Sequence, residues 1–195
     1  MRIELRNDSV LLDGYVNAVA RDSRNIPQMN GKLFKEQVVP KTFQRALEKA
    51  EDVELLLNHD KNKRLGSIKD GNLELFEDNI GLRAICTVTD ADIIKKAKNN
   101  ELRGWSFGFF VNKDKWEDLD DGTQRRYLEE IDLTEVSIVD NTRVPAYIGT
   151  SIEKRANEEK MHETRTEDFK AVIEKRNVGD ELSTFYKELE LLKLK

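Results

Sequence analysis

Residues 103–109 read Arg-Gly-Trp-Ser-Phe-Gly-Phe, a hydrophobic stretch with a serine two positions before a glycine. Successive side chains of an extended strand point to opposite faces of its sheet. Ser106 and Gly108 therefore share one face, while Phe107 and Phe109 share the other, where they are expected to be core. The stretch predicts a buried strand in which the glycine leaves open space beside the serine hydroxyl.

Period-two alternation of apolar and polar residues continues outward from this stretch through the first 150 residues, most clearly at 82–88. The pairs Asp70-Gly71 and Asp121-Gly122 favour tight turns, so we expect each to close a hairpin. Other strands are expected at residues 10–20, 53–58, 73–75, 105–112 and 127–139.

Apolar residues at helical spacing predict helices at 43–50 and 93–97, the second capped by Thr89 or Asp90. Residues 22–39 show no clear period, so we expect a long loop there. Many short strands with few helices predict an α+β, mainly β fold, either a barrel or a sandwich decorated by helices.

Charge density changes near residue 150, where we place a boundary between a domain at 1–150 and a tail at 151–195. The tail has 11 acidic and 10 basic residues among 45, and only one of the ten glycines. Apolar residues at helical spacing between Leu182 and Leu192, and again at 169–173, predict a charged, amphipathic helical tail. Its apolar face fits docking on its own domain, on a partner or on another copy.

Composition excludes several classes of protein. With 33 basic against 38 acidic residues, the chain has no electrostatic footprint for nucleic acid. No apolar run approaches the roughly 20 residues of a membrane helix, and the N-terminus lacks a signal peptide's apolar stretch. Cys86 is the single cysteine and is expected in the core, and two histidines make a poor metal site. We expect no cofactor, no metal, no nucleic acid, no membrane contact and a cytoplasmic location.

Three segments carry residues that are able to do chemistry. His59 ends an apolar strand, Ser106 lies in the stretch quoted above, and Glu135 is in the middle of a third strand. Alternation places Glu135 on the same largely apolar face as Leu133 and Ser137, where a bare carboxylate is costly. A serine, a histidine and a carboxylate are the minimum set for nucleophilic acyl transfer.

The residue types alone leave other interpretations open. His59 also fits an ordinary polar residue at a strand end, and Ser106 fits a packing residue. Glu135 fits an ion pair with Arg103 or Arg143 equally well. A metal site around His59 and nearby acids has a single candidate histidine.

The motifs in their order and spacing resemble the tailed-phage prohead proteases of the HK97 type over nearly all of residues 10–150. The resembling segments are Val38-Val39-Pro40-Lys41-Thr42-Phe43, Asn58-His59-Asp60 with Leu65-Gly66, Trp105-Ser106-Phe107-Gly108-Phe109, Leu133-Thr134-Glu135-Val136-Ser137-Ile138-Val139 and Pro145-Ala146-Tyr147.

This resemblance implies that His59 is the general base, Ser106 the nucleophile and Glu135 the third member of a triad. It implies a fold shared with herpesvirus assemblins, a β-barrel surrounded by helices. In the assemblins an arginine-bearing loop after the triad helps to form the oxyanion hole, which makes Arg143 a candidate. Trp105 departs from the smaller residue usual before the serine, and alternation points it away from the Ser106 face.

The resemblance further implies a serine endopeptidase of capsid maturation. It would act inside the assembling prohead in the host cytoplasm, on the scaffold segment of the major capsid protein and on its own tail. Self-association is also implied, with the tail serving as a targeting, scaffolding or self-processed segment. The alternative is a non-catalytic capsid assembly or scaffolding protein on a degenerate protease fold, against which the retained triad residues argue. An esterase is a third interpretation, but the chain lacks the Gly-x-Ser-x-Gly elbow of the common hydrolase fold.

Overall fold

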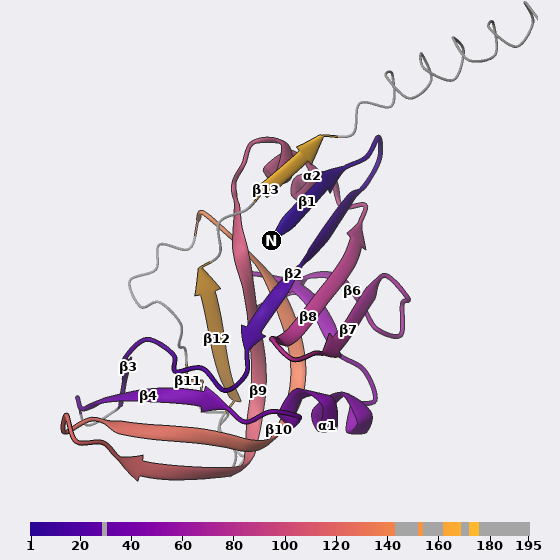
Figure 1. The fold of residues 1–195 in the computed structure, drawn as a ribbon. Helices are drawn as coiled ribbons and strands as arrows, with labels where there is room; N and C mark the ends of the chain where they lie inside the picture. Colours follow the sequence, from indigo (N-terminus) through magenta and orange to yellow (C-terminus); the bar gives the residue numbers. More distant parts are fainter. Residues whose placement is uncertain (29–30, 143–151, 154–161, 169–171, 176–195) are drawn as a thin grey trace, which may run out of the picture.

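The computed structural model describes residues 1–28, 31–142, 152–153, 162–168 and 172–175, which form two β-sheets and two helices (Figure 1). A five-stranded sheet has the order β13-β1-β2-β8-β7. Its strands are β1 (Arg2–Leu5), β2 (Val10–Ala18), β7 (Leu73–Glu77), β8 (Gly81–Val88) and β13 (Val172–Lys175). The predicted mainly β fold is therefore confirmed.

An eight-stranded sheet has the order β11-β12-β9-β10-β4-β3, with β5 paired to β10 and β6 paired to β5. Its strands are β3 (Ile26–Pro27), β4 (Leu33–Val38), β5 (Glu54–Leu57), β6 (Asp60–Ser67), β9 (Leu102–Asp118), β10 (Gln124–Asp140), β11 (Ile152–Glu153) and β12 (His162–Asp168). Neither sheet closes on itself within the described ranges, so the expected closed barrel is not found there. The likeness to assemblins stays a prediction.

The long β9–β10 hairpin is the spine of the larger sheet, and in Figure 1 it passes α1 before turning alongside β4. Asp121-Gly122 lies in the loop that closes it, as predicted, with Gly122 at φ 77°. β10 pairs in parallel with β4 along its first half and with β5 along its second half. β10 thus lies between β5 and β9, and its Ile138 pairs with Leu57 at the end of β5 and with Trp105 near the start of β9.

The core lies on the face of β9 that alternation predicted. Phe107 and Phe109 are fully buried, and their rings stack with centroids 5.1 Å apart. Phe43 of α1 (Thr42–Lys49) meets Phe107 edge-on at 5.3 Å. Trp105 is also fully buried in this core, which agrees with its predicted direction.

Two other local predictions are confirmed. Helix α2 (Ala91–Lys98) begins after Asp90, whose side chain accepts hydrogen bonds from the backbone N–H groups of Asp92 and Ile93. Cys86 is buried in the core, where burial raises the pKa of its thiol to about 12. A thiol in this environment stays protonated at neutral pH and is no nucleophile.

Two predictions about loops and turns differ from the structure. Residues 22–39 contain β3 and β4 as well as loop, because Phe34, Glu36 and Val38 alternate inward on β4. Asp70-Gly71 forms a turn, with Gly71 at φ 75°, but it connects β6 to β7 of the other sheet and closes no hairpin.

The helical prediction for the tail is wrong where the structure describes it. β12 pairs with β9, and β13 pairs in parallel with β1, so 162–168 and 172–175 are strands. A free sheet edge supplies hydrogen-bond partners that a local helical pattern does not reveal. The segment from Leu182 to Leu192 lies outside the described residues. The division at residue 150 stays a prediction.

Candidate active site

His59, Ser106 and Glu135 meet in one hydrogen-bonded row. His59 Nε2 lies 2.6 Å from Ser106 Oγ, and His59 Nδ1 lies 2.5 Å from Glu135 Oε1. Ser106 is fully buried, and Glu135 and the His59 side chain are 5% and 11% exposed. The imidazole thus bridges a hydroxyl and a carboxylate, the arrangement in which histidine acts as a general base.

The histidine is held by a two-residue turn between β5 and β6. Leu57 pairs with Asp60, so Asn58 and His59 are the two turn residues, with φ of 55° and 61°. Positive φ at both positions is the geometry of hairpin turns in which asparagine is favoured first. Asn58 anchors the turn to β10, because its Nδ2 donates to Asp140 Oδ1 at 2.9 Å and its Oδ1 accepts from the Asp140 N–H at 3.1 Å.

A β-bulge at Thr134 directs Glu135 into the site. Leu133 pairs with Phe109 and Glu135 pairs with Gly108. Thr134, between them on β10, therefore has no partner on β9. Leu133 therefore packs in the core, while Glu135 faces the serine. The prediction that Glu135 and Leu133 share a face is wrong, because a bulge interrupts strict alternation. The shared face of Glu135 and Ser137 is confirmed.

Gly108 makes room for the carboxylate. A Cβ placed there would lie 2.4 Å from Glu135 Oε1 and 2.6 Å from His162 Cε1. The open space predicted beside the serine is thus occupied by the Glu135 carboxylate and the His162 ring. His162 is half-buried, with its Nε2 2.7 Å from Thr134 Oγ1.

Ser137 connects the carboxylate to the histidine turn, a role that sequence reasoning missed. Its hydroxyl donates to Glu135 Oε2 at 2.7 Å and accepts from the His59 backbone N–H at 3.1 Å. The only signal in the sequence was its position two residues after Glu135 on one strand face. Both Glu135 oxygens therefore have partners, whereas Arg103, considered earlier as an ion-pair partner, is exposed.

The Asp140 carboxylate stabilises the turn that carries Asn58 and His59. Burial by itself raises the pKa of this carboxyl, but hydrogen bonds from Thr142 and Asn58 outweigh burial and lower it to about 2. Lys96 of α2 adds an ion pair at 3.1 Å. The carboxylate is thus ionised throughout the neutral range and holds the Asn58 amide in place.

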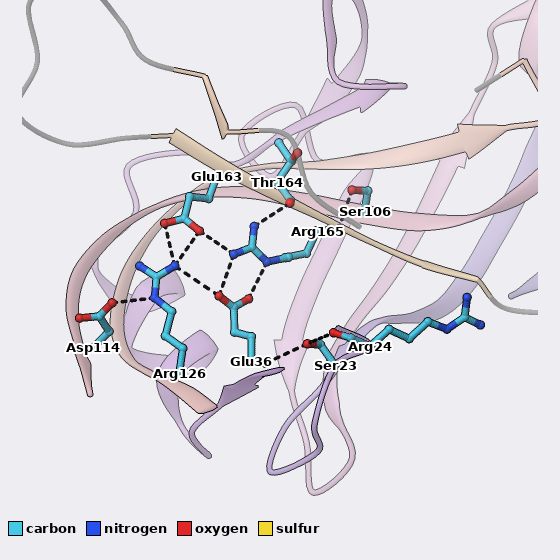
Figure 2. Close-up of polar contacts among 9 residues, drawn as sticks. All are labelled: Ser23, Arg24, Glu36, Ser106, Asp114, Arg126, Glu163, Thr164 and Arg165. Atoms are coloured by element: carbon cyan, nitrogen blue, oxygen red, sulfur yellow. Dashed lines mark hydrogen bonds and ion pairs between the residues drawn. The ribbon is translucent and has the colours of Figure 1, made fainter. Parts of the chain in front are cut away.

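Strand β12 lies against the serine, which sequence reasoning also missed. Ser106 Oγ is 2.5 Å from the main-chain oxygen of Arg165 (Figure 2). The sequence showed no sign of this contact, because the composition of the tail predicted a charged, amphipathic helix. Arg143, the candidate oxyanion residue, lies outside the described residues.

Within the described part of the chain, no group of three or more histidine, cysteine or acidic residues is placed to hold a metal ion. No helix in those ranges is long and apolar enough to cross a membrane.

The model of one protein family, described as caudovirus prohead serine protease, matches residues 1–167. No curated protein and no solved structure gives a significant match to the chain.

Proposed function

The chain belongs to the caudovirus prohead serine protease family, and from that premise we propose that Ser106, His59 and Glu135 are its catalytic triad. The observation that carries the proposal is the row in which His59 reaches Ser106 Oγ at 2.6 Å and Glu135 Oε1 at 2.5 Å. The two contacts use different nitrogens of the imidazole ring. Nε2 is therefore able to take a proton from Ser106 while Nδ1 is held by Glu135.

Each residue then has one role in peptide cleavage. Ser106 Oγ attacks the substrate carbonyl carbon as His59 Nε2 takes the hydroxyl proton. Glu135 holds the Nδ1–H tautomer and stabilises the imidazolium that forms. His59 returns the proton to the leaving amine, and water hydrolyses the acyl-enzyme by the same steps in reverse.

Ser137 and Asn58 are positioning residues in this scheme. Ser137 fixes the second carboxylate oxygen of Glu135, and Asn58 ties the histidine turn to β10. Proton transfer depends on short, aligned contacts, so small displacements of the imidazole reduce the rate.

A prohead protease acts within the assembling capsid, and its family implies the capsid protein as substrate. We propose that this chain cleaves the scaffold segment of the major capsid protein. We also propose that it processes its own tail. Residues 162–168 of its own tail are extended, the conformation that adds to a sheet edge.

Co-expression with the major capsid protein of the same phage tests the proposal. Wild-type enzyme is expected to shorten the capsid protein, whereas Ser106→Ala leaves it at full length with the enzyme folded, as judged by circular dichroism and thermal unfolding. Ser67→Ala is the matched control, because Ser67 is equally buried but its hydroxyl accepts from the Asp70 N–H. Equal processing by Ser106→Ala would contradict the proposal and favour a non-catalytic assembly protein.

A further inference from the structure

Strand β12 lies antiparallel to β9, the strand that carries the serine. Arg165 pairs with Phe107, and Thr166 pairs with Ser106 itself. Extended peptides bind many proteins by adding a strand to a sheet edge in this way, with the backbone giving affinity and alternate side chains giving specificity. β12 therefore places the peptide bond between Arg165 and Thr166 directly beside the nucleophile.

The carbonyl group of that bond is the one that the serine contacts. Ser106 Oγ lies 2.5 Å from Arg165 O and 2.6 Å from His59 Nε2. The serine hydroxyl donates to Arg165 O, so cleavage requires that its proton pass to His59 Nε2 as Oγ turns toward the carbonyl carbon. The nucleophile, the base and the carbonyl group of this peptide bond are thus in mutual contact, and a shift of Oγ from the carbonyl oxygen to the carbonyl carbon starts the acyl transfer.

The Arg165 side chain is bound as a recognised group. Its Nε and Nη2 donate to the two oxygens of Glu36 at 2.6 Å and 2.7 Å, and its guanidinium carbon lies 5.2 Å from the Phe109 ring centroid. The residue is 4% exposed. Burial by itself lowers the pKa of this guanidinium, but Glu36 and Glu163 outweigh burial and raise it. The paired, planar contact selects arginine over lysine, which has no fork of donors.

A second side chain of β12 is held on the same face. Glu163 accepts two hydrogen bonds from Arg126 Nη1, at 2.9 Å and 2.8 Å, and contacts Arg165 Nη2 at 2.5 Å. Arg126 also contacts Glu36 at 3.4 Å, so Glu36 keeps a cationic partner from the body of the domain (Figure 2). Two residues of the strand are thus matched by two oppositely charged residues of β4 and β10.

We infer that Glu36 determines specificity for arginine immediately before the cleaved bond, and that the chain cuts itself between Arg165 and Thr166. This inference rests on the proposed function. It adds the residue that selects the substrate and the position of the cleaved bond.

The step is an ordinary acyl transfer. Ser106 Oγ bonds to the Arg165 carbonyl carbon while His59 takes the hydroxyl proton. The bond from that carbon to the Thr166 nitrogen breaks, and His59 passes the proton to this nitrogen, which leaves as a free amine. Water then gives a proton to His59 and its oxygen to the carbonyl carbon. The ester breaks, Ser106 regains the proton, and Arg165 ends in a carboxylate.

The position of β12 also has a consequence for other substrates. Ser106 is fully buried with β12 in place, so an external peptide reaches it only after this strand leaves the β9 edge. Cleavage after Arg165 falls inside β12 and separates residues 162–165 from the rest of the strand and from β13, which pairs with β1. The first turnover would thus loosen the strand that covers the site.

Intact-mass measurement of the full chain after expression tests this inference. Wild type is expected to yield one fragment ending at Arg165 and one beginning at Thr166, and Ser106→Ala is expected to stay whole. Arg165→Lys and Glu36→Gln should slow this cleavage about 10- to 100-fold, the effect of losing a charge-assisted hydrogen-bonded pair. Arg83→Gln and Asp13→Asn, which break a similar two-point pair between β8 and β2, should leave it unchanged.

Glu36→Gln leaves a buried guanidinium with fewer charges around it and is able to destabilise the fold. The double variant Glu36→Gln with Arg165→Gln removes both charges together and keeps the test decisive. It is expected to fold, by thermal unfolding, and to remain uncut after position 165. Cleavage there at the wild-type rate would overturn the inference.

Two further outcomes separate this inference from the proposed function. If the wild-type chain processes the capsid protein but leaves its own 165–166 bond intact, or cuts itself at another position, the inference is wrong and the proposed function remains supported. If neither the chain nor the capsid protein is cut in a Ser106-dependent way, both fail.

Discussion

The Ser137 hydroxyl donates a 2.7 Å hydrogen bond to Glu135 Oε2, from two residues further along the same face of β10. The same hydroxyl accepts from the His59 backbone N–H at 3.1 Å. One small side chain therefore sets the orientation of the carboxylate and the position of the turn that carries the imidazole. Its two contacts thus reach both members of the His59–Glu135 pair.

Ser137→Ala should reduce the cleavage rate about tenfold, because Glu135 loses one hydrogen bond and the His59 N–H loses its acceptor. The measurement is the initial rate of capsid-protein processing. Ser67→Ala, a buried serine of β6 with a different hydrogen bond, is expected to keep the wild-type rate. A Ser137→Ala enzyme as fast as the wild type would show that the bridge has no part in positioning.

Glu135→Gln should cost less activity than His59→Ala. Removing the imidazole removes the general base, an effect of about 10²- to 10⁴-fold, whereas glutamine keeps the shape of Glu135 but lacks the charge that stabilises the imidazolium. Single-turnover rates of both variants on one substrate give the comparison. Equal losses, or a greater loss in Glu135→Gln, would argue against Glu135 as the orienting acid.

Gly108→Ala should abolish most activity, because its new methyl group would lie 2.4 Å from Glu135 Oε1 and displace the carboxylate. A double-mutant cycle with Glu135→Ala tests this cause. In the Glu135→Ala background the carboxylate is absent, so adding Gly108→Ala is expected to lower the rate by a much smaller factor. If the rate losses of the two variants are additive, the new methyl group acts through another contact, for example the one with His162.

Asp140→Asn should destabilise the protein at neutral pH but not in strong acid. The pKa of Asp140 is lowered to about 2 in the folded state, below the ordinary value near 3.9 for an unfolded chain. Its stabilising contribution is therefore complete above about pH 4 and is lost as the pH falls toward 2.

Urea unfolding of wild type and Asp140→Asn at pH 7 and at pH 2.5 measures this difference. The difference in unfolding free energy between wild type and Asp140→Asn should be large at pH 7 and small at pH 2.5. Asp8→Asn is the control, because Asp8 is exposed, and it should show little change at either pH. A gap of equal size at both pH values would contradict the assignment.

Much of the fold follows from local patterns. Alternation separated Phe107 from Ser106 on the two faces of β9, and Asp90 marked the start of α2, because side-chain direction and end capping depend on neighbouring residues alone. β4 was missed because Glu36 stands at an inward position. A buried glutamate is tolerated only where cations from elsewhere meet it, here Arg126 and Arg165.

The bulge at Thr134 and the Asp70-Gly71 turn were beyond prediction for a related reason. A bulge is defined by how β10 pairs with β9, and a turn says nothing of which sheet its next strand joins. β12 was not predicted as a strand, because its charges are buried only through pairs with residues far away in the sequence.

The sequence by itself indicated both helices and most of the longer strands of residues 1–142, and it supplied one serine, one histidine and one carboxylate in motifs that marked the family. Tertiary structure alone decided that the three meet. His59 and Ser106 are 47 residues apart, and His59 and Glu135 are 76 apart. Such contacts come from the pairing of β5 and β9 with opposite edges of β10, which depends on the packing of the whole sheet and leaves no signal in any single segment.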